Sequence, residues 1–119
     1  MKKVFLVDDQ RVMNLVHHKF INMVDPELKV DSFLNGSEAL EALEKDLPEL
    51  IFLDLNMPVM NGWQFLDEVK MRQLDLNVVI LTSSNSLQDQ EKSLEYQQVK
   101  KFVQKPLDRS GFEEILEAL

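Results

Sequence analysis

Short, unbroken apolar runs that end in polar residues constrain the fold of this chain most strongly. Residues 4–7, 50–53 and 78–81 are three such runs. An apolar stretch of this length is typical of a strand buried on both faces, as in the centre of a parallel sheet. Residues 29–33 and 101–104 are more polar and fit strands at the edges of the same sheet.

Helical patterns fill the intervals between these runs. Apolar residues recur three or four apart in four stripes: Val12, Val16, Phe20 and Met23; Ala39, Leu40, Leu43 and Leu47; Phe65, Leu66 and Val69; Phe112, Ile115, Leu116 and Leu119. Residues 87–96 predict a further, weakly amphipathic helix. Capping pairs place helix starts at Asn35, Asn61 and Ser110, each three residues before an acid or amide. Five strands therefore alternate with five helices.

This alternation predicts a flavodoxin-like α/β fold, a doubly wound five-stranded parallel sheet of order 2-1-3-4-5. With 119 residues and 45% hydrophobic content, the whole chain, residues 1–119, is expected to form one domain. Ligands of such sheets bind beyond the carboxyl ends of the strands, at the switch point between strands one and three. Asp8, Asp9 and Asp54 occupy that position in the sequence.

Three carboxylates at one edge of a sheet repel one another unless a cation joins them. Their oxygen ligands suit a hard divalent ion, and an open cluster that leaves room for water and phosphate favours Mg²⁺ over Ca²⁺. A single acid after a strand often caps a helix or faces solvent, but three acids at the switch point favour a metal-binding site. Asp54 is then the candidate nucleophile, because carboxylates form acyl phosphates when a metal screens the incoming charge.

Thr82 and Lys105 complete this chemistry. Thr82 follows the fourth predicted strand and Lys105 follows the fifth, so both are expected at the edge that holds the acids. A hydroxyl and an ammonium can bind phosphoryl oxygens that the metal leaves free. Alone, a threonine ending a strand or a solvated lysine would carry little information.

The chain resembles the response regulator receiver domains of two-component signalling along its whole length. The matching segments are residues 4–9, 53–58, Gly62, 81–84 and 105–107. The resemblance implies that Asp54 is the phosphoacceptor and that Mg²⁺ binds Asp9, Asp54 and the backbone carbonyl of Asn56. Asp8 would act mainly through water. Thr82 and Lys105 would contact the phosphoryl group.

The resemblance also implies how the domain works with partners. A histidine kinase or a histidine phosphotransfer protein would supply the phosphoryl group, and Thr82 and Phe102 would act as switch residues. The output would be binding to another protein at the face of the fourth helix, fifth strand and fifth helix. Such a domain assists its own phosphoryl transfer and dephosphorylation but is a switch rather than an enzyme. The Lys105-Pro106 bond is expected to be cis.

Two features leave the details of that switch open. A phenylalanine such as Phe102 is most often a core residue, and it lacks the hydroxyl of a tyrosine. Gln98 and Val99 stand where the family often has Gly-Ala, so the loop beside the fourth helix can differ in shape. His17 and His18 match no metal or phosphohistidine motif and are expected at the surface or half-buried.

Composition excludes several function classes. A net charge of -8 opposes direct binding to nucleic acid, and the absence of cysteine excludes disulfides and thiolate metal sites. The apolar segment after Lys3 is too short for a signal peptide or a membrane span, which favours a cytoplasmic protein without membrane contact.

Other proteins with strand-end carboxylates fit less well. A haloacid dehalogenase-like phosphatase needs its two acids two residues apart, whereas Asp8 and Asp9 are adjacent. A flavodoxin needs a Ser/Thr/Gly-rich phosphate loop after its first strand, where this chain has acids. A free-standing regulator is slightly favoured over a receiver cut from a longer protein.

Overall fold

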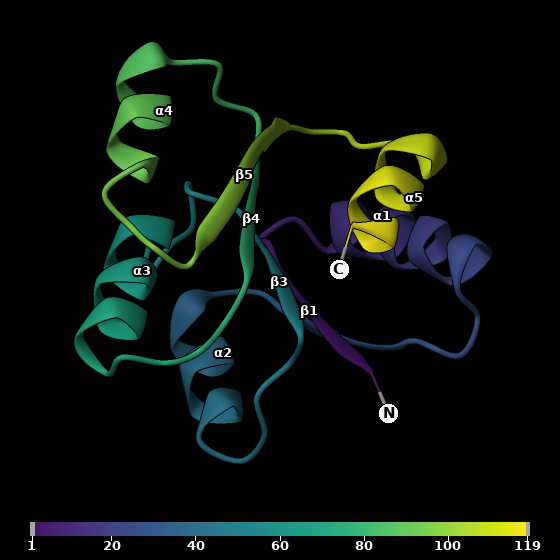
Figure 1. Ribbon diagram of the computed structural model, residues 1–119, viewed down its shortest axis with the longest axis horizontal. Coiled ribbons are helices and arrows are strands. Elements are labelled where there is room, and N and C mark those ends of the chain that lie inside the picture. The colour runs from purple at the N-terminus through teal and green to yellow at the C-terminus, as the bar shows by residue number, and fades with distance from the viewer. Residues whose placement is uncertain (1, 119) are drawn as a thin grey trace.

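The computed structural model describes residues 2–118, in which five parallel strands alternate with five helices (Figure 1). The strands are β1 (Lys3–Val7), β2 (Lys29–Phe33), β3 (Leu50–Leu53), β4 (Val78–Thr82) and β5 (Val99–Gln104). The helices are α1 (Arg11–Val24), α2 (Gly36–Leu43), α3 (Gly62–Met71), α4 (Leu87–Ser93) and α5 (Arg109–Glu117). The sheet order β2-β1-β3-β4-β5 confirms the predicted topology and both edge strands.

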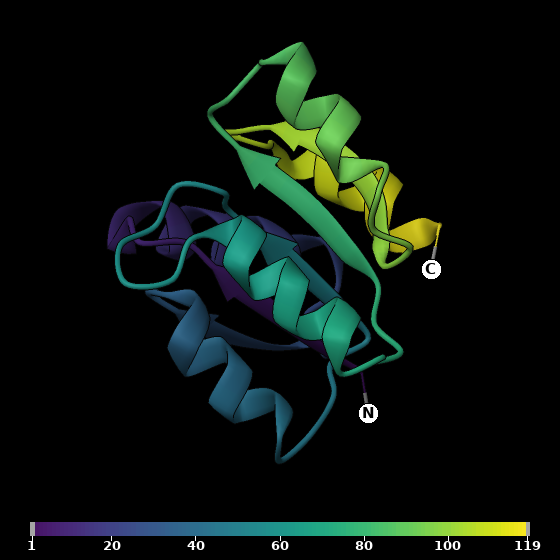
Figure 2. The ribbon, with the colours of Figure 1, turned by 90° about the vertical axis from the view of Figure 1, so that its left-hand side faces the viewer.

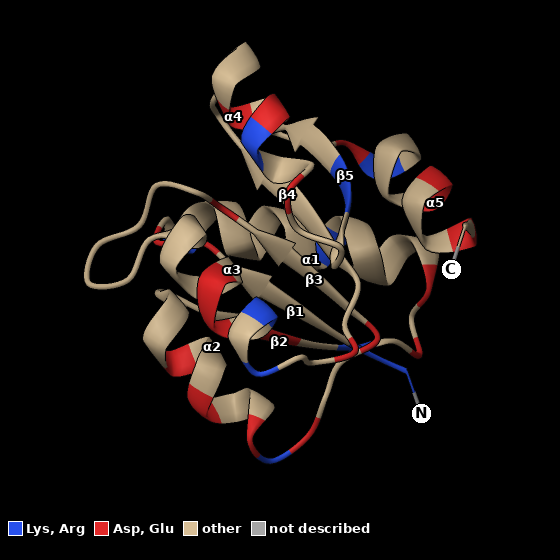
Figure 3. Ribbon diagram, turned by 60° about the vertical axis from the view of Figure 1, so that its left-hand side comes forward, with Lys and Arg blue, Asp and Glu red and all other residues tan. Residues whose placement is uncertain are grey.

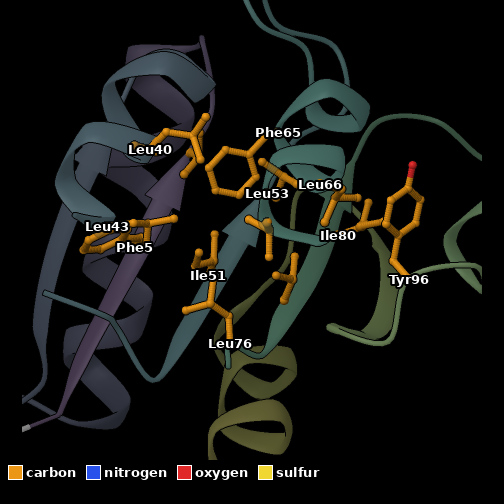
Figure 4. Packing of buried hydrophobic residues seen from close by; sticks show 14 of the residues in the cluster. Phe5, Leu40, Leu43, Ile51, Leu53, Phe65, Leu66, Leu76, Ile80 and Tyr96 are labelled. Carbon is orange, nitrogen blue, oxygen red and sulfur yellow. The ribbon is translucent and has the colours of Figure 1, made fainter. Parts of the chain in front are cut away.

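Helices cover both faces of the sheet, α1 and α5 on one and α2, α3 and α4 on the other (Figures 1 and 2). Successive residues of β1 belong to different layers, because side chains alternate along a strand. Val4 and Leu6 pack with the α1 and α5 side, and Phe5 and Val7 with the α2 and α3 side. Figure 4 shows the buried residues on the α2 and α3 side, with Phe5 among them. Burial on both faces explains why the central strands are apolar throughout.

Helix starts follow the sequence signals in two places out of three. Asn35 and Asn61 cap α2 and α3 as predicted, and Asn61 forms a full capping box with Gln64. The predicted start of α5 at Ser110 is wrong. Asp108 is the capping residue, and its carboxylate accepts both the Gly111 N–H and the Ser110 hydroxyl. A charged acceptor upstream therefore displaces the weaker hydroxyl cap.

The buried stripe of α1 differs from the prediction. Val12 and Met23 are 71% and 54% exposed, whereas Asn14, His17 and Ile21 are buried. The Asn14 amide donates to the carbonyl oxygen of Asp8, just after β1, at 3.0 Å and to that of Phe33, the last residue of β2, at 3.3 Å. These bonds fix the rotation of the helix. The expectation that His17 lies at the surface or half-buried is therefore wrong.

The remaining helices agree with their stripes except at their ends. Phe65, Leu66 and Val69 are buried in α3, and Ala39, Leu40 and Leu43 are buried in α2. Leu47 lies beyond α2 and is 42% exposed. The helix predicted over residues 87–96 ends at Ser93, and Leu119 lies outside the described residues. Within residues 2–118, each helix is too short or too polar to cross a lipid bilayer.

Candidate functional site

The acids lie together because β1 and β3 are adjacent parallel strands. Val7 and Leu53 are paired in register at the ends of these strands. The backbone N–H of Asp54 donates to the carbonyl of Val7 at 2.9 Å, which extends the ladder by one residue. The side chains that follow the two strands therefore meet at the switch point of the sheet.

Asp8, Asp9 and Asp54 each offer a carboxylate oxygen, and these oxygens lie within 4.8 Å of one another. Asp8 and Asp54 are buried, and Asp9 is exposed. Burial raises the pKa of Asp8, although the hydrogen bond from Lys105 opposes this shift. Three oxygen ligands on an open edge fit a hard divalent cation that keeps some of its water. The donor set therefore fits Mg²⁺.

Lys105 lies between two of the acids. Its Nζ is 2.8 Å from Asp8 Oδ2 and 3.2 Å from Asp54 Oδ2, and its side chain is only 7% exposed. Burial lowers the pKa of Lys105, but the bond to Asp8 and the Asp54 charge outweigh it, and the net pKa is raised. The lysine therefore stays charged and offsets part of the repulsion between the acids.

The backbone around Lys105 joins the site to β4. Its N–H donates to the carbonyl of Thr82, the last residue of β4, at 2.9 Å. The Lys105-Pro106 bond is cis, as the resemblance implies, and within residues 2–118 the other X-Pro bonds are trans. The prediction that Lys105 lies at the edge that holds the acids is confirmed by its contacts with Asp8 and Asp54.

Thr82 is fully buried, and its hydroxyl oxygen accepts the N–H of Ser84 at 3.3 Å. The Ser84 hydroxyl in turn donates to the carboxylate of Asp89 on α4 at 2.7 Å. These bonds connect the edge of the sheet to the first turn of α4. Phe102, on β5, is half-buried and packs against the core on the α2 and α3 side.

The loop after β3 is closely packed behind Asp54. Asn56 is exposed, and its N–H donates to Asp54 Oδ1 at 3.4 Å. Gly62, the first residue of α3, donates its N–H to the carbonyl of Leu55 at 2.9 Å. A Cβ at position 62 would lie 2.6 Å from the Asp54 carbonyl oxygen. A side chain at this position would therefore displace the loop that carries the candidate nucleophile.

Gly62→Ala is expected to lower the free energy of unfolding by about 1–3 kcal/mol, because the added methyl group meets backbone atoms that cannot rotate away. Urea unfolding measures the change. Gly36→Ala is the matched control, since its Cβ would first meet the flexible side chain of Met60, at 3.1 Å. Equal midpoints for the two variants would contradict the close packing at Gly62.

Three residues near the site were not anticipated from the sequence. Gln10 donates its N–H to Asp8 Oδ1 at 2.8 Å, and its side-chain oxygen is 3.5 Å from Lys105 Nζ. Asn14 and His17 lie on the buried face of α1. Their spacing with Ile21, at i, i+3 and i+7, is typical of one face of a helix and could have indicated their burial. The more apolar stripe that begins at Val12 predicted a different buried face.

Acidic residues outnumber basic ones in the chain, 21 against 13. Figure 3 shows Asp and Glu on α2, α3 and α5 as well as in the loops. A surface of this charge opposes non-specific attraction to nucleic acid phosphates.

The fold and site together define a doubly wound α/β protein with an acid cluster and a buried lysine at its switch point. The chain belongs to the response regulator receiver domain family, whose profile matches residues 4–117. It is thus a receiver domain of two-component signalling.

Individual proteins agree with this assignment. A protein-glutamate methylesterase/protein-glutamine glutaminase of Treponema denticola is 43% identical over 82 residues, which cover 68% of this chain and 22% of the relative. An uncharacterized response regulatory protein of Staphylococcus epidermidis is 30% identical over 100% of this chain and 47% of its own length. The chain thus spans less than half the length of these relatives.

The fold also matches a solved structure along almost its full length. The two-component response regulator from Cytophaga hutchinsonii superimposes with a TM-score of 0.87 at 26% sequence identity. The match covers 99% of this chain and 96% of that chain.

Proposed function

We propose that this receiver domain accepts a phosphoryl group on Asp54 from a histidine kinase or a histidine phosphotransfer protein. The observation that carries the proposal is the buried Asp54 carboxylate, which lies in a three-acid cluster and 3.2 Å from the Lys105 ammonium. A carboxylate beside an ammonium group and a candidate metal site can approach a phosphoryl group without prohibitive repulsion once the cation is bound.

In the transfer, an Asp54 carboxylate oxygen bonds to phosphorus while the bond from phosphorus to the donor nitrogen breaks. The donor imidazole leaves with that electron pair. Lys105 would stabilise a phosphoryl oxygen by charge, and the Thr82 hydroxyl, which here accepts the Ser84 N–H, would turn to donate to another phosphoryl oxygen. Asp8, Asp9, Asp54 and the Asn56 carbonyl would hold Mg²⁺, which screens the phosphoryl charge when bound.

The proposed output follows from the contacts of Thr82. If its hydroxyl turns toward the phosphoryl group, the N–H of Ser84 loses its acceptor, and Ser84 is the residue that bonds Asp89 on α4. A groove of about 340 Å³ lies between α4 and β5, lined in part by Leu87, Leu94 and Phe102. This groove belongs to the face of α4, β5 and α5, where we place the downstream protein partner.

Incubation with acetyl phosphate and Mg²⁺ is expected to add the mass of one phosphoryl group to the intact protein. The addition should be lost when Mg²⁺ is removed with a chelator, because the acids then repel the incoming phosphoryl charge. Intact-mass spectrometry measures both states. Equal labelling with and without the ion would contradict the role of the acid cluster.

Mg²⁺ is also expected to raise the thermal midpoint of unfolding, since it binds the folded cluster and not the unfolded chain. At ten times its dissociation constant, the ion should add about 1.4 kcal/mol to the free energy of unfolding. The midpoint is measured at constant ionic strength. Asp9→Asn is the control: Asp9 is exposed, so the variant should fold normally but respond less to Mg²⁺. An equal response in the two proteins would exclude Asp9 as a ligand.

A further inference from the structure

His17 is a buried polar residue that phosphoryl transfer itself does not use. Its side chain lies on the inner face of α1 and is 1% exposed. The ring packs edge-on against Phe112 of α5, with 5.2 Å between the ring centroids. A histidine in such a position needs a hydrogen-bond partner, because burying an unpaired polar group is costly.

That partner is the loop that carries Lys105. The backbone N–H of Leu107, two residues after Lys105, donates to His17 Nε2 at 3.3 Å. Burial and the nearby Lys105 charge lower the pKa of His17 to about 4, so the imidazole is neutral at pH 7. A neutral imidazole with its proton on Nδ1 presents Nε2 as an acceptor. The state of the ring thus matches the bond it makes.

Two backbone hydrogen bonds anchor the loop, one at Lys105 itself and one two residues later at Leu107. The Lys105 N–H donates to the Thr82 carbonyl at the end of β4, and the Leu107 N–H donates to His17 on α1. The side chain of Lys105 reaches back from the first anchor to Asp8 and Asp54. Without the bond to His17, the loop keeps the Lys105 hydrogen bond to β4 and the packing of the Leu107 side chain, but no hydrogen bond fixes the backbone of Leu107 to α1.

We propose that His17 is a positioning residue for phosphoryl transfer, because its Nε2 fixes the loop after β5 and thereby holds the Lys105 ammonium against Asp8 and Asp54. His17 does not touch the reacting atoms. Its effect passes through the backbone of Leu107 to the place of Lys105. The inference rests on the proposed function for its consequence, but the placement of Lys105 can be tested separately.

The test compares His17→Leu with His17→Gln. Leucine fills a similar volume without an acceptor, whereas the glutamine amide oxygen can replace Nε2. In the leucine variant, acetylation of Lys105 by a trace of acetic anhydride, normalised to exposed Lys101 in the same sample, should rise about three- to tenfold. The initial rate of phosphorylation by acetyl phosphate should fall by a similar factor. The glutamine variant should recover most of both values.

The outcomes separate the two proposals. If the wild type gains no phosphoryl group, the proposed function fails, and the Lys105 acetylation ratio still tests the role of His17. An unchanged Lys105 ratio in His17→Leu overturns the inference, whatever happens to the phosphorylation rate. If the leucine variant does not fold, ¹⁵N spectra of the wild type decide instead. Nε2 should be the unprotonated ring nitrogen, and a protonated Nε2 at pH 7 would overturn the assignment.

Discussion

Asp54→Asn is expected to abolish the phosphoryl mass gain from acetyl phosphate and Mg²⁺, because an amide is not a nucleophile at neutral pH. The effect should be complete rather than partial. Asp54 follows β3 and is buried, and its Oδ2 lies 3.2 Å from Lys105 Nζ. Intact-mass spectrometry over a time course of several wild-type half-times measures it.

The fold of this variant should survive, because Asp8 still pairs with Lys105 at 2.8 Å. Circular dichroism and the urea midpoint provide this control. Removing one of three neighbouring negative charges should leave the free energy of unfolding unchanged or slightly higher in the absence of Mg²⁺. A mutant phosphorylated to the wild-type level at another residue would contradict the assignment of Asp54.

Lys105→Met is expected to have the largest effect on stability. The change removes the cation that pairs with Asp8 and Asp54, whose side chains are 7% and 3% exposed. Breaking a buried ion pair by deleting one partner typically costs about 3–5 kcal/mol, since the remaining charge stays buried. Phosphorylation should also slow by about tenfold or more, because the phosphoryl oxygens lose a cationic partner.

Mg²⁺ should restore much of the stability lost in Lys105→Met, because it supplies positive charge to the same acids and no longer competes with the lysine. Urea unfolding of both proteins with and without Mg²⁺ measures this. Lys101→Met is the matched control, since Lys101 is exposed on β5 and should show neither effect. Normal stability and normal phosphorylation of the Lys105 variant would reduce this lysine to a surface role.

The sheet and the acid cluster could be predicted because their signals are local and agree with one another. An unbroken apolar run such as residues 50–53 has few alternatives to a central strand, and the residue after it must lie at the carboxyl edge. Asp8 and Asp54 therefore follow from strand order alone. The same rule predicts that Lys105 lies at this edge. Its contacts with Asp8 and Asp54 could not be predicted from the sequence, because they depend on the path of the folded chain.

The buried face of α1 could not be predicted from periodicity because polar contacts determine it. Asn14 and His17 bond to backbone groups of residues far along the chain, Phe33 and Leu107, and these bonds outweigh the burial of Val12. The prediction that α5 starts at Ser110 was wrong for a related reason. Asp108 and Ser110 are candidate acceptors two residues apart, and in the folded chain the charged carboxylate of Asp108 accepts both the Gly111 N–H and the Ser110 hydroxyl.

The central claim is that Asp54 carries the phosphoryl group, and trapping the acyl phosphate tests it most directly. Borohydride reduces a phosphorylated aspartate to homoserine, whereas it leaves free carboxylates and phosphate esters unchanged. After treatment with acetyl phosphate, Mg²⁺ and borohydride, peptide mapping should find homoserine at position 54 and aspartate at positions 8 and 9. Homoserine at another aspartate, or phosphate retained on a serine or threonine with Asp54 intact, would contradict the account.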